Sequence, residues 1–240
     1  MIGITGSDGK TTTTTLIYTM LKEEGYNCYL GGNIGTPLFA KIDEMKPDDI
    51  IVLELSSFQL MTLKNSPSIS IVTNVSPNHL DVHKSYEEYI EAKKNIFRFQ
   101  NENDIVVLNY DNDITRDFAF EAKGEVRFFS RKQRLEKGVI VQDNKIKIVT
   151  PESEEEIMNI DDILLLGMHN VENACTAIAA VKDLVKKESI VKVLTTFKGV
   201  EHREEFVREL NGVKWYNDSI GSSPTRTIAG LASFKTKVVL

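Results

Sequence analysis

The sequence predicts an α/β fold, with a mostly parallel sheet covered by helices on both faces and a small antiparallel section. Three observations support this prediction. A glycine-rich loop, 3–10, leads directly into a helical pattern. Continuous apolar runs at 50–55, 69–72 and 104–109 are typical of strands buried on both faces of a parallel sheet. Segments with helical spacing separate these runs, so strands and helices alternate along the chain.

The glycine-rich loop has the composition of a phosphate-binding loop, or P-loop. Glycines at 3, 6 and 9 allow positive φ and bring several N–H groups towards one anion, and the helix adds its positive dipole end. Lys10 supplies charge for phosphates, and the hydroxyl of Thr11 suits Mg²⁺. The loop is a variant, because the strict pattern requires glycine where this chain has Ile4. A plain glycine turn is the alternative, but the apolar helical spacing after Thr12 favours nucleotide binding.

Spacing and turn residues predict the elements in order. Met1–Thr5 is expected to form the strand before the loop, and the first helix runs from Thr11 to about Glu24 and ends at Gly25. Further strands are expected at 26–30, 50–55, 68–74, 104–109, 126–130, 138–142 and 145–149. Further helices are expected at 38–45, 85–99 and about 174–184. The last three strands have the alternating character of an antiparallel section, and 143–144 is expected to form a hairpin turn.

The end of the chain is expected to belong to a second unit. The acidic stretch 151–162 is interpreted as a solvated connector. A seam at 197–199 predicts a main domain at 1–198 and the start of another at 199–240. Because a strand is expected to be cut short at each end, with 237–240 expected to be a strand just beginning, we expect an excised piece of a longer protein.

Composition excludes several classes of protein. The chain has 41% hydrophobic and 27% charged residues, which is globular and not disordered. Its net charge of −6 favours neither nucleic acid nor an anionic membrane as a partner. No apolar run approaches the roughly 20 residues that span a bilayer. Cys28 and Cys175 have no metal or redox spacing and are interpreted as buried thiols in a reducing cytoplasm.

Polar residues at predicted strand ends are candidates for a site. Glu54 ends a buried strand, where α/β folds bind ligands, and its carboxylate could hold Mg²⁺ with Thr11. A glutamate that faces water is the alternative, but an isolated charge within a sheet is costly, which favours the functional interpretation. The loop 74–83 follows another strand and carries His79 and Asp81, which could ligate a metal. For this loop an ordinary polar role stays open as well.

Four further groups are ambiguous from pattern alone. Lys93 and Lys94 are interpreted as helix surface. Asn170 and Asn173 are expected to cap a helix, with contact to an adenine or ribose as the alternative. The groups 202–203 and 217–219 lie near the seam, where a basic and an acidic group suit a nucleotide clamped between domains.

Eight stretches, in order along the whole chain, resemble the ATP-dependent Mur ligases of peptidoglycan synthesis. They are GITGSDGKTTT, GGNIG, LELSSFQL, TNVSPNHLDVH, YIEAKKNIF, GMHNVENA, GVEHREE and NDSIGSSPTRT. LELSSFQL and NDSIGSSPT favour the members that add D-glutamate over those that add alanine, a diamino acid or a dipeptide. The resemblance implies a P-loop NTPase-like central domain followed by the first part of a Rossmann-like C-terminal domain. It also implies a cytoplasmic enzyme, expected to be a monomer.

The resemblance further implies roles by position. Residues implied to bind ATP are Gly6, Ser7, Asp8, Gly9, Lys10, Thr11, Thr12, Asn170, Asn173, Arg203 and Asp218. Residues implied to contact the muramoyl-alanine substrate are Asn33, Ser57 and Gln59. The implied catalytic residues are Lys10, Glu54, His79 and Lys93, and the implied ligands of two Mg²⁺ ions are Thr11, Glu54, His79 and Lys93. Lys93 matches a carbamylated lysine of the family, and this replaces the surface interpretation.

The implied substrates are ATP, UDP-N-acetylmuramoyl-L-alanine and D-glutamate. Phosphoryl transfer to the substrate carboxylate would give an acyl phosphate, which the amine of D-glutamate then attacks. Since the uridine-binding domain and most of the glutamate-binding domain are expected to lie outside this chain, we expect it to bind nucleotide weakly and to ligate poorly. A folylpolyglutamate synthase-type ligase and a P-loop regulator that hydrolyses ATP slowly are the alternatives.

Overall fold

A computed structural model of the chain describes residues 1–240 except 36, 78–82, 204, 220, 222–223 and 235. Its main body is a nine-stranded sheet in the order β2-β3-β1-β4-β5-β6-β7-β8-β9. The strands are β1 (Ile2–Thr5), β2 (Cys28–Gly32), β3 (Ile50–Glu54), β4 (Ile69–Val72), β5 (Ile105–Asn109), β6 (Glu125–Ser130), β7 (Gly138–Gln142), β8 (Lys145–Val149) and β9 (Glu154–Asn159). Neighbouring strands from β2 to β7 pair in parallel, and β8 and β9 add an antiparallel end.

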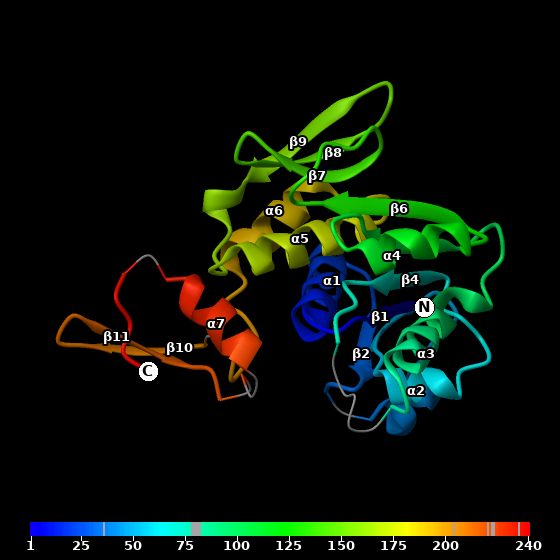
Figure 1. The fold of residues 1–240 in the computed structure, drawn as a ribbon, viewed down its shortest axis with the longest axis horizontal. Helices are drawn as coiled ribbons and strands as arrows, with labels where there is room; N and C mark the ends of the chain where they lie inside the picture. Colours follow the sequence, from blue (N-terminus) through cyan, green and yellow to red (C-terminus); the bar gives the residue numbers. More distant parts are fainter. Residues whose placement is uncertain (36, 78–82, 204, 220, 222–223, 235) are drawn as a thin grey trace.

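Helices cover both faces of the sheet (Figure 1). The α-helices of this body are α1 (Lys10–Glu24), α2 (Ser57–Met61), α3 (Tyr86–Arg98), α4 (Asp113–Asp117), α5 (Met168–Val181) and α6 (Lys187–Thr196). Three 3₁₀ helices lie at Leu38–Glu44, Phe118–Phe120 and Ile160–Asp162. No helix in the described part of the chain is both long and apolar enough to cross a membrane.

Alternate side chains of the central strands enter two different cores. Val107 of β5 packs with α1, α5 and α6 on one face, in a core that also contains Ile17 and Ile178. Its neighbours Val106 and Leu108 pack with α2 and α3 on the opposite face. Burial on both faces explains why these strands are continuous apolar runs, and it confirms the predicted α/β architecture.

Two elements at the antiparallel end differ from the sequence prediction. β6, expected in the antiparallel section, pairs in parallel with both β5 and β7, and the direction changes only at the hairpin β7–β8. The acidic stretch 151–162, expected to be a connector, contains β9. Lys145 and Lys147 on β8 form ion pairs at 2.8 and 2.6 Å with Glu156 and Glu154, so cross-strand charge pairing supports a strand that no apolar pattern indicates.

The turns and helix ends agree with the sequence prediction better than the strands of the antiparallel end do. Asp143 and Asn144 adopt φ of 52° and 61°, the left-handed values that a two-residue hairpin turn requires. Gly25 ends α1 with φ of 104°. The expected helix at 38–45 is present as a 3₁₀ helix at Leu38–Glu44, and both Cys28 and Cys175 are buried free thiols, as predicted.

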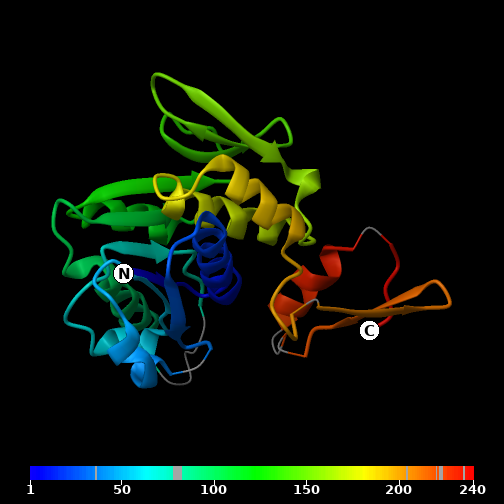
Figure 2. The same ribbon diagram turned by 180° about the vertical axis from the view of Figure 1, so that it is seen from behind.

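The last part of the chain forms a smaller unit beside the main body. It consists of the antiparallel pair β10 (Glu205–Leu210) and β11 (Val213–Asn217) with α7 (Pro224–Ala232). Both ribbon views show this unit set apart from the nine-stranded sheet (Figures 1 and 2). Residues 237–240, expected to begin a strand, have no regular structure. α2, α4, α6, β10 and α7 were not predicted, because three are short and none has a long periodic pattern.

Candidate functional site

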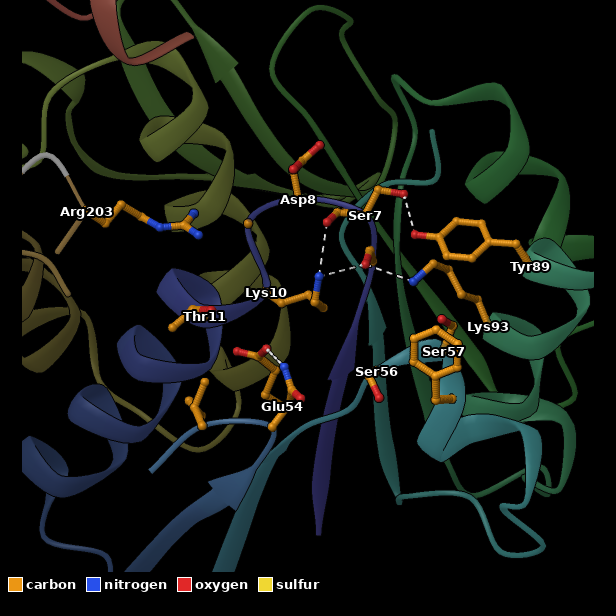
Figure 3. A pocket seen from close by; sticks show the side chains of 15 residues that line it. Ser7, Asp8, Lys10, Thr11, Glu54, Ser56, Ser57, Tyr89, Lys93 and Arg203 are labelled. Atoms are coloured by element: carbon orange, nitrogen blue, oxygen red, sulfur yellow. Dashed lines mark hydrogen bonds between the residues drawn. The ribbon is translucent and has the colours of Figure 1, made fainter. Parts of the chain in front are cut away.

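A pocket of about 320 Å³ opens at the carboxyl ends of β1 and β3, beside the start of α1 (Figure 3). This edge of a parallel sheet is where α/β folds place ligands. The pocket is lined by Gly6, Ser7, Asp8, Gly9, Lys10, Thr11, Asn33, Ile34, Glu54, Ser56, Ser57, Phe58, Tyr89, Lys93 and Arg203. The structure therefore brings together eleven of the residues that the resemblance implies.

The P-loop can exist only with glycine at two positions. Gly9 has φ of 80°, and a Cβ there would lie 2.3 Å from Oδ1 of Asn173. A Cβ on Gly6 would lie 1.9 Å from Oγ1 of Thr73. No side chain caps the N-terminus of α1. The first amides of α1 therefore face the pocket with the positive end of the helix dipole, as an anion site requires.

Two lysines converge on one carbonyl of the P-loop. Nζ of Lys10 donates to the backbone oxygens of Gly6 and Ser7 at 3.1 and 3.0 Å, and Nζ of Lys93 donates to the same Gly6 oxygen at 2.8 Å. Figure 3 shows the two ammonium groups approaching from opposite sides. Two lysine amino groups are thus placed at the point where a polyphosphate would add negative charge.

Lys93 is a core residue of α3, which contradicts the surface interpretation from its pattern. It is 1% exposed, and its Nζ lies 4.5 Å from the ring centre of Tyr89. Burial, followed by the nearby charge of Lys10, lowers the pKa of Lys93 well below its usual value. Lys94 is partly buried and pairs with Glu91 and Glu121. The buried side chain of Lys93 can therefore exist as a neutral amine, unlike an ordinary lysine at the surface.

Glu54 is a buried carboxylate with one oxygen in use. It is 1% exposed, and its Oε1 accepts a hydrogen bond from Nδ2 of Asn33 at 3.1 Å. Its Oε2 has no hydrogen-bond partner in the described structure, although it is buried. Because an unpaired buried carboxylate oxygen is costly, and because Thr11 lines the same pocket, these residues fit a hard divalent cation such as Mg²⁺.

The second proposed metal ligand lies outside the described residues. His79 and Asp81 fall within 78–82, so the structure does not test them. Among the described residues, no group of three or more His, Cys, Asp or Glu side chains could hold a metal ion by itself. A metal site here would have to use Glu54 with hydroxyl groups, a modified lysine or the undescribed loop.

Ser57 is held by residues that sequence reasoning missed. Its Oγ lies 2.9 Å from Nε2 of the buried His83, and Nδ1 of His83 lies 3.7 Å from Glu88. The His83 ring stacks on Phe58 at 5.0 Å and meets Tyr89 edge-on at 5.2 Å. Tyr89 precedes Lys93 by four residues and so shares its helix face, a signal that could have identified it.

Besides Asp218, four implied residues in the described part of the chain do not line the pocket. Gln59 accepts hydrogen bonds from N and Oγ of Ser56 in the capping box of α2. Thr12 is buried in α1. Asn173 is buried beside the P-loop and receives a bond from Thr13 at 3.4 Å. Asn170 donates to the oxygen of Leu166 at 2.7 Å.

The capping role expected for the two asparagines is wrong. Gly167 is the N-cap of α5, and no side chain caps that helix. Arg203 reaches the pocket from the smaller unit, as Figure 3 shows, whereas Asp218 does not line it. Of the two groups expected near the seam, the basic Arg203 thus lines the pocket of the P-loop, and the acidic Asp218 does not.

With a phosphate loop seated between β1 and α1 at the carboxyl edge of a parallel sheet, the chain falls in the class of P-loop α/β proteins. Comparison with known families makes this assignment narrower. The Mur ligase middle domain matches residues 4–181, more than half of the chain. The protein belongs to the Mur ligase family.

Relatives with high identity carry one name. The chain is 65% identical over 240 residues to the UDP-N-acetylmuramoylalanine--D-glutamate ligase of Acetivibrio thermocellus, and 58% identical to that of Ruminiclostridium cellulolyticum. Each match covers all of this chain and 52% of the relative. The chain therefore spans about half the length of the curated relatives it matches.

Solved structures share the fold. MurF from Acinetobacter baumannii superposes with a TM-score of 0.75 at 21% identity, covering 98% of this chain and 54% of that one. MurF from Thermotoga maritima, solved in complex with ADP, gives 0.70 at 21% identity, covering 98% and 57%. At these identities the likeness concerns the fold alone.

Proposed function

We propose that this chain is the nucleotide-binding part of an ATP-dependent ligase that joins D-glutamate to UDP-N-acetylmuramoyl-L-alanine in peptidoglycan synthesis. The observation that carries the proposal is one pocket uniting a P-loop, a buried Glu54 with a free oxygen, and a buried lysine. The identity of the two substrates rests on the names of the relatives. We place the reaction in the cytoplasm, in a monomeric enzyme.

In this proposal the P-loop receives the phosphates of ATP. The first amides of α1 bind phosphate oxygens, and Lys10 exchanges the carbonyls of Gly6 and Ser7 for a phosphate. Arg203 approaches from the smaller unit and adds charge at the pocket wall. Thr11 and Glu54 would hold Mg²⁺, with His79 and Lys93 as ligands of a second ion. When bound, Mg²⁺ neutralises charge on the phosphates and on the substrate carboxylate.

The chain's contribution to the reaction is positioning and electrostatic screening. A carboxylate and a γ-phosphate repel each other, and Lys10 reduces that repulsion. The carboxylate oxygen attacks the γ-phosphorus, the bond to ADP breaks, and an acyl phosphate results. The amine of D-glutamate then attacks the acyl carbon, phosphate leaves, and the amine loses a proton. Asn33, Ser57 and Gln59 are assigned to the muramoyl-alanine substrate, with Ser57 oriented by His83.

A carbamate on Lys93 fits its surroundings. The lowered pKa favours a neutral amine, whose lone pair can bond to the carbon of CO₂ with loss of one proton to solvent. The product is a carboxylate-like anion beside Lys10, which offsets the positive charge there. In this form Lys93 would be a metal ligand, and in the amine form it would not.

The first experiment follows ADP release by the complete gene product that carries this sequence. UDP-N-acetylmuramoyl-L-alanine is supplied with D-glutamate, L-glutamate, L-lysine or glycine in turn. Lys10→Ala should lower the rate at least about a hundredfold, because it removes the charge facing the phosphates. Lys22→Ala, at an exposed position of the same helix, should leave the rate unchanged and is the matched control.

The outcome separates the proposal from its alternatives. ADP release that depends on D-glutamate and is lost in Lys10→Ala supports the ligase. ADP release at the same rate with every amino acid would point to a slow P-loop ATPase. ADP release that depends on folate would point to a folylpolyglutamate synthase-type enzyme.

A further inference from the structure

We propose that Asn74 is a positioning residue for the P-loop, which it clamps through the backbone of Asp8. The inference rests on the proposed nucleotide site but concerns a residue that neither lines the pocket nor belongs to the P-loop. Asn74 follows β4, and no role was assigned to its side chain from the sequence.

Asn74 forms three hydrogen bonds with two consecutive P-loop residues. Its Oδ1 accepts from N of Asp8 at 3.0 Å, and its Nδ2 donates to O of Asp8 at 3.1 Å. Its own backbone oxygen accepts from N of Ser7 at 2.9 Å. Oγ1 of Thr73 donates to the same Asp8 oxygen at 2.6 Å. The amide side chain thus pairs with both backbone polar groups of one residue, Asp8, as a neighbouring strand would.

The segment that carries Asn74 is itself fixed on both sides. Ser7 Oγ donates to O of Ser76 at 3.0 Å and accepts from N of Ser76 at 2.9 Å. On the far side, Asn112 accepts from N of Val75 at 3.3 Å and donates to its O at 3.0 Å. Because Asn112 caps α4, the clamp connects the P-loop to the start of that helix.

This arrangement determines which amides are left for a phosphate. The N–H groups of Ser7 and Asp8 donate to Asn74, so they are engaged before any ligand arrives. Helix α1 begins at Lys10 without a side-chain cap, which leaves the amides of its first turn without intrahelical partners. A phosphate is therefore bound by the later part of the loop, and Asn74 holds the earlier part in place.

The clamp matters because a glycine lies on each side of the two clamped residues. Gly6 and Gly9 have wide conformational freedom, and Gly9 must keep its positive φ for α1 to begin where it does. Without the clamp, a smaller fraction of molecules holds the loop in its binding shape, and the apparent affinity falls by that fraction. Loss of the two side-chain hydrogen bonds to Asp8 should therefore weaken the apparent affinity about tenfold.

The test compares Mg-ATP affinity in three variants of the complete gene product, by calorimetric titration. Asn74→Ala removes the clamp, and Thr73→Val removes the 2.6 Å bond to O of Asp8 together with a longer bond, at 3.4 Å, to O of Thr5. Asn95→Ala is the control, because Asn95 is also half-buried and donates to a backbone oxygen, that of Leu60 at 3.0 Å, away from the P-loop. We expect a dissociation constant about tenfold higher for Asn74→Ala, a smaller rise for Thr73→Val, and the parent value for Asn95→Ala.

A kinetic measurement distinguishes positioning from general destabilisation. In Asn74→Ala the KM for ATP should rise, while kcat at saturating ATP stays near that of the parent, because ATP restores the loop. Parent-like affinity in Asn74→Ala, or an equal loss in Asn95→Ala, overturns the inference. If Asn74→Ala fails to fold, Thr73→Val takes its place: parent-like affinity for Mg-ATP in Thr73→Val, or an equal loss in Asn95→Ala, then overturns the inference.

Lys10→Ala separates this inference from the proposed function. If the parent binds Mg-ATP and Lys10→Ala does not, the nucleotide site stands, and Asn74→Ala tests the clamp alone. If Lys10→Ala binds as tightly as the parent, or the parent does not bind Mg-ATP, both the nucleotide site and the clamp are overturned.

Discussion

Lys93 illustrates how far residue type and residue position can disagree. Lysine is rarely fully buried, which favoured a surface interpretation. Yet its helical spacing places it between Tyr89 and Phe97 on the buried face of α3. The helical spacing is thus consistent with a buried Lys93, and the resemblance to the Mur ligases replaced the surface interpretation. Its depth in the core could not be read from the sequence, because that depends on the P-loop carbonyl above it.

The lowered pKa of Lys93 predicts how stability varies with pH. Between the lowered folded pKa and the unfolded value of about 10.4, the unfolded chain binds more protons, so the free energy of unfolding rises with pH. The slope contributed by one lysine is at most about 1.4 kcal/mol per pH unit. Lys93→Met should remove this contribution in denaturant unfolding in CO₂-free buffers. Lys22→Met, an exposed control, should keep the parent slope, and an unchanged slope in Lys93→Met would contradict the prediction.

At the scale of elements, prediction succeeded where local chemistry decides the structure. Gly25 ends α1 and 143–144 forms a hairpin turn, each for reasons within a few residues. β9 was missed because its support comes from lysines on β8, outside its own sequence. α2 was missed because five residues are too few for a periodic pattern.

Gly25 offers a clean test of a helix terminus. Its φ is 104°, and an added Cβ would meet nothing within 4 Å, so a side chain there introduces backbone strain without a clash. Gly25→Ala should lower the free energy of unfolding by about 1 kcal/mol. Gly25→Asn should cost less, because asparagine tolerates the left-handed region. Equal losses in the two variants, measured by urea denaturation, would argue against backbone strain as the cause.

At the scale of the whole molecule, both hydrophobic cores belong to the main body. Among the described residues, neither core contains a member after Phe197, although Arg203 of the smaller unit lines the pocket. The residues that form the cores therefore end earlier in the chain than the residues that line the pocket. The main body carries the cores, and the smaller unit contributes charge to the site.

This division predicts the behaviour of a shortened chain. Residues 1–198 should unfold cooperatively, with a midpoint within a few degrees of the 240-residue chain, since both cores are retained. Its affinity for Mg-ATP should be lower, because Arg203 is absent. Calorimetric unfolding and nucleotide titration measure the two effects, with Arg203→Ala in the longer chain as the matched control. Loss of cooperative unfolding would show that the domain boundary is misplaced.

The sequence by itself determined the parallel sheet, the P-loop, the hairpin turn and the strand-end position of Glu54. These follow from apolar spacing, glycine, and the residues just beside them. Only the tertiary structure decided the free oxygen of Glu54, the His83–Ser57 contact, and the clamp of Asn74 on Asp8. Each of these joins segments far apart in the chain, so its energy depends on how the strands are ordered, and no local pattern of residues records that order.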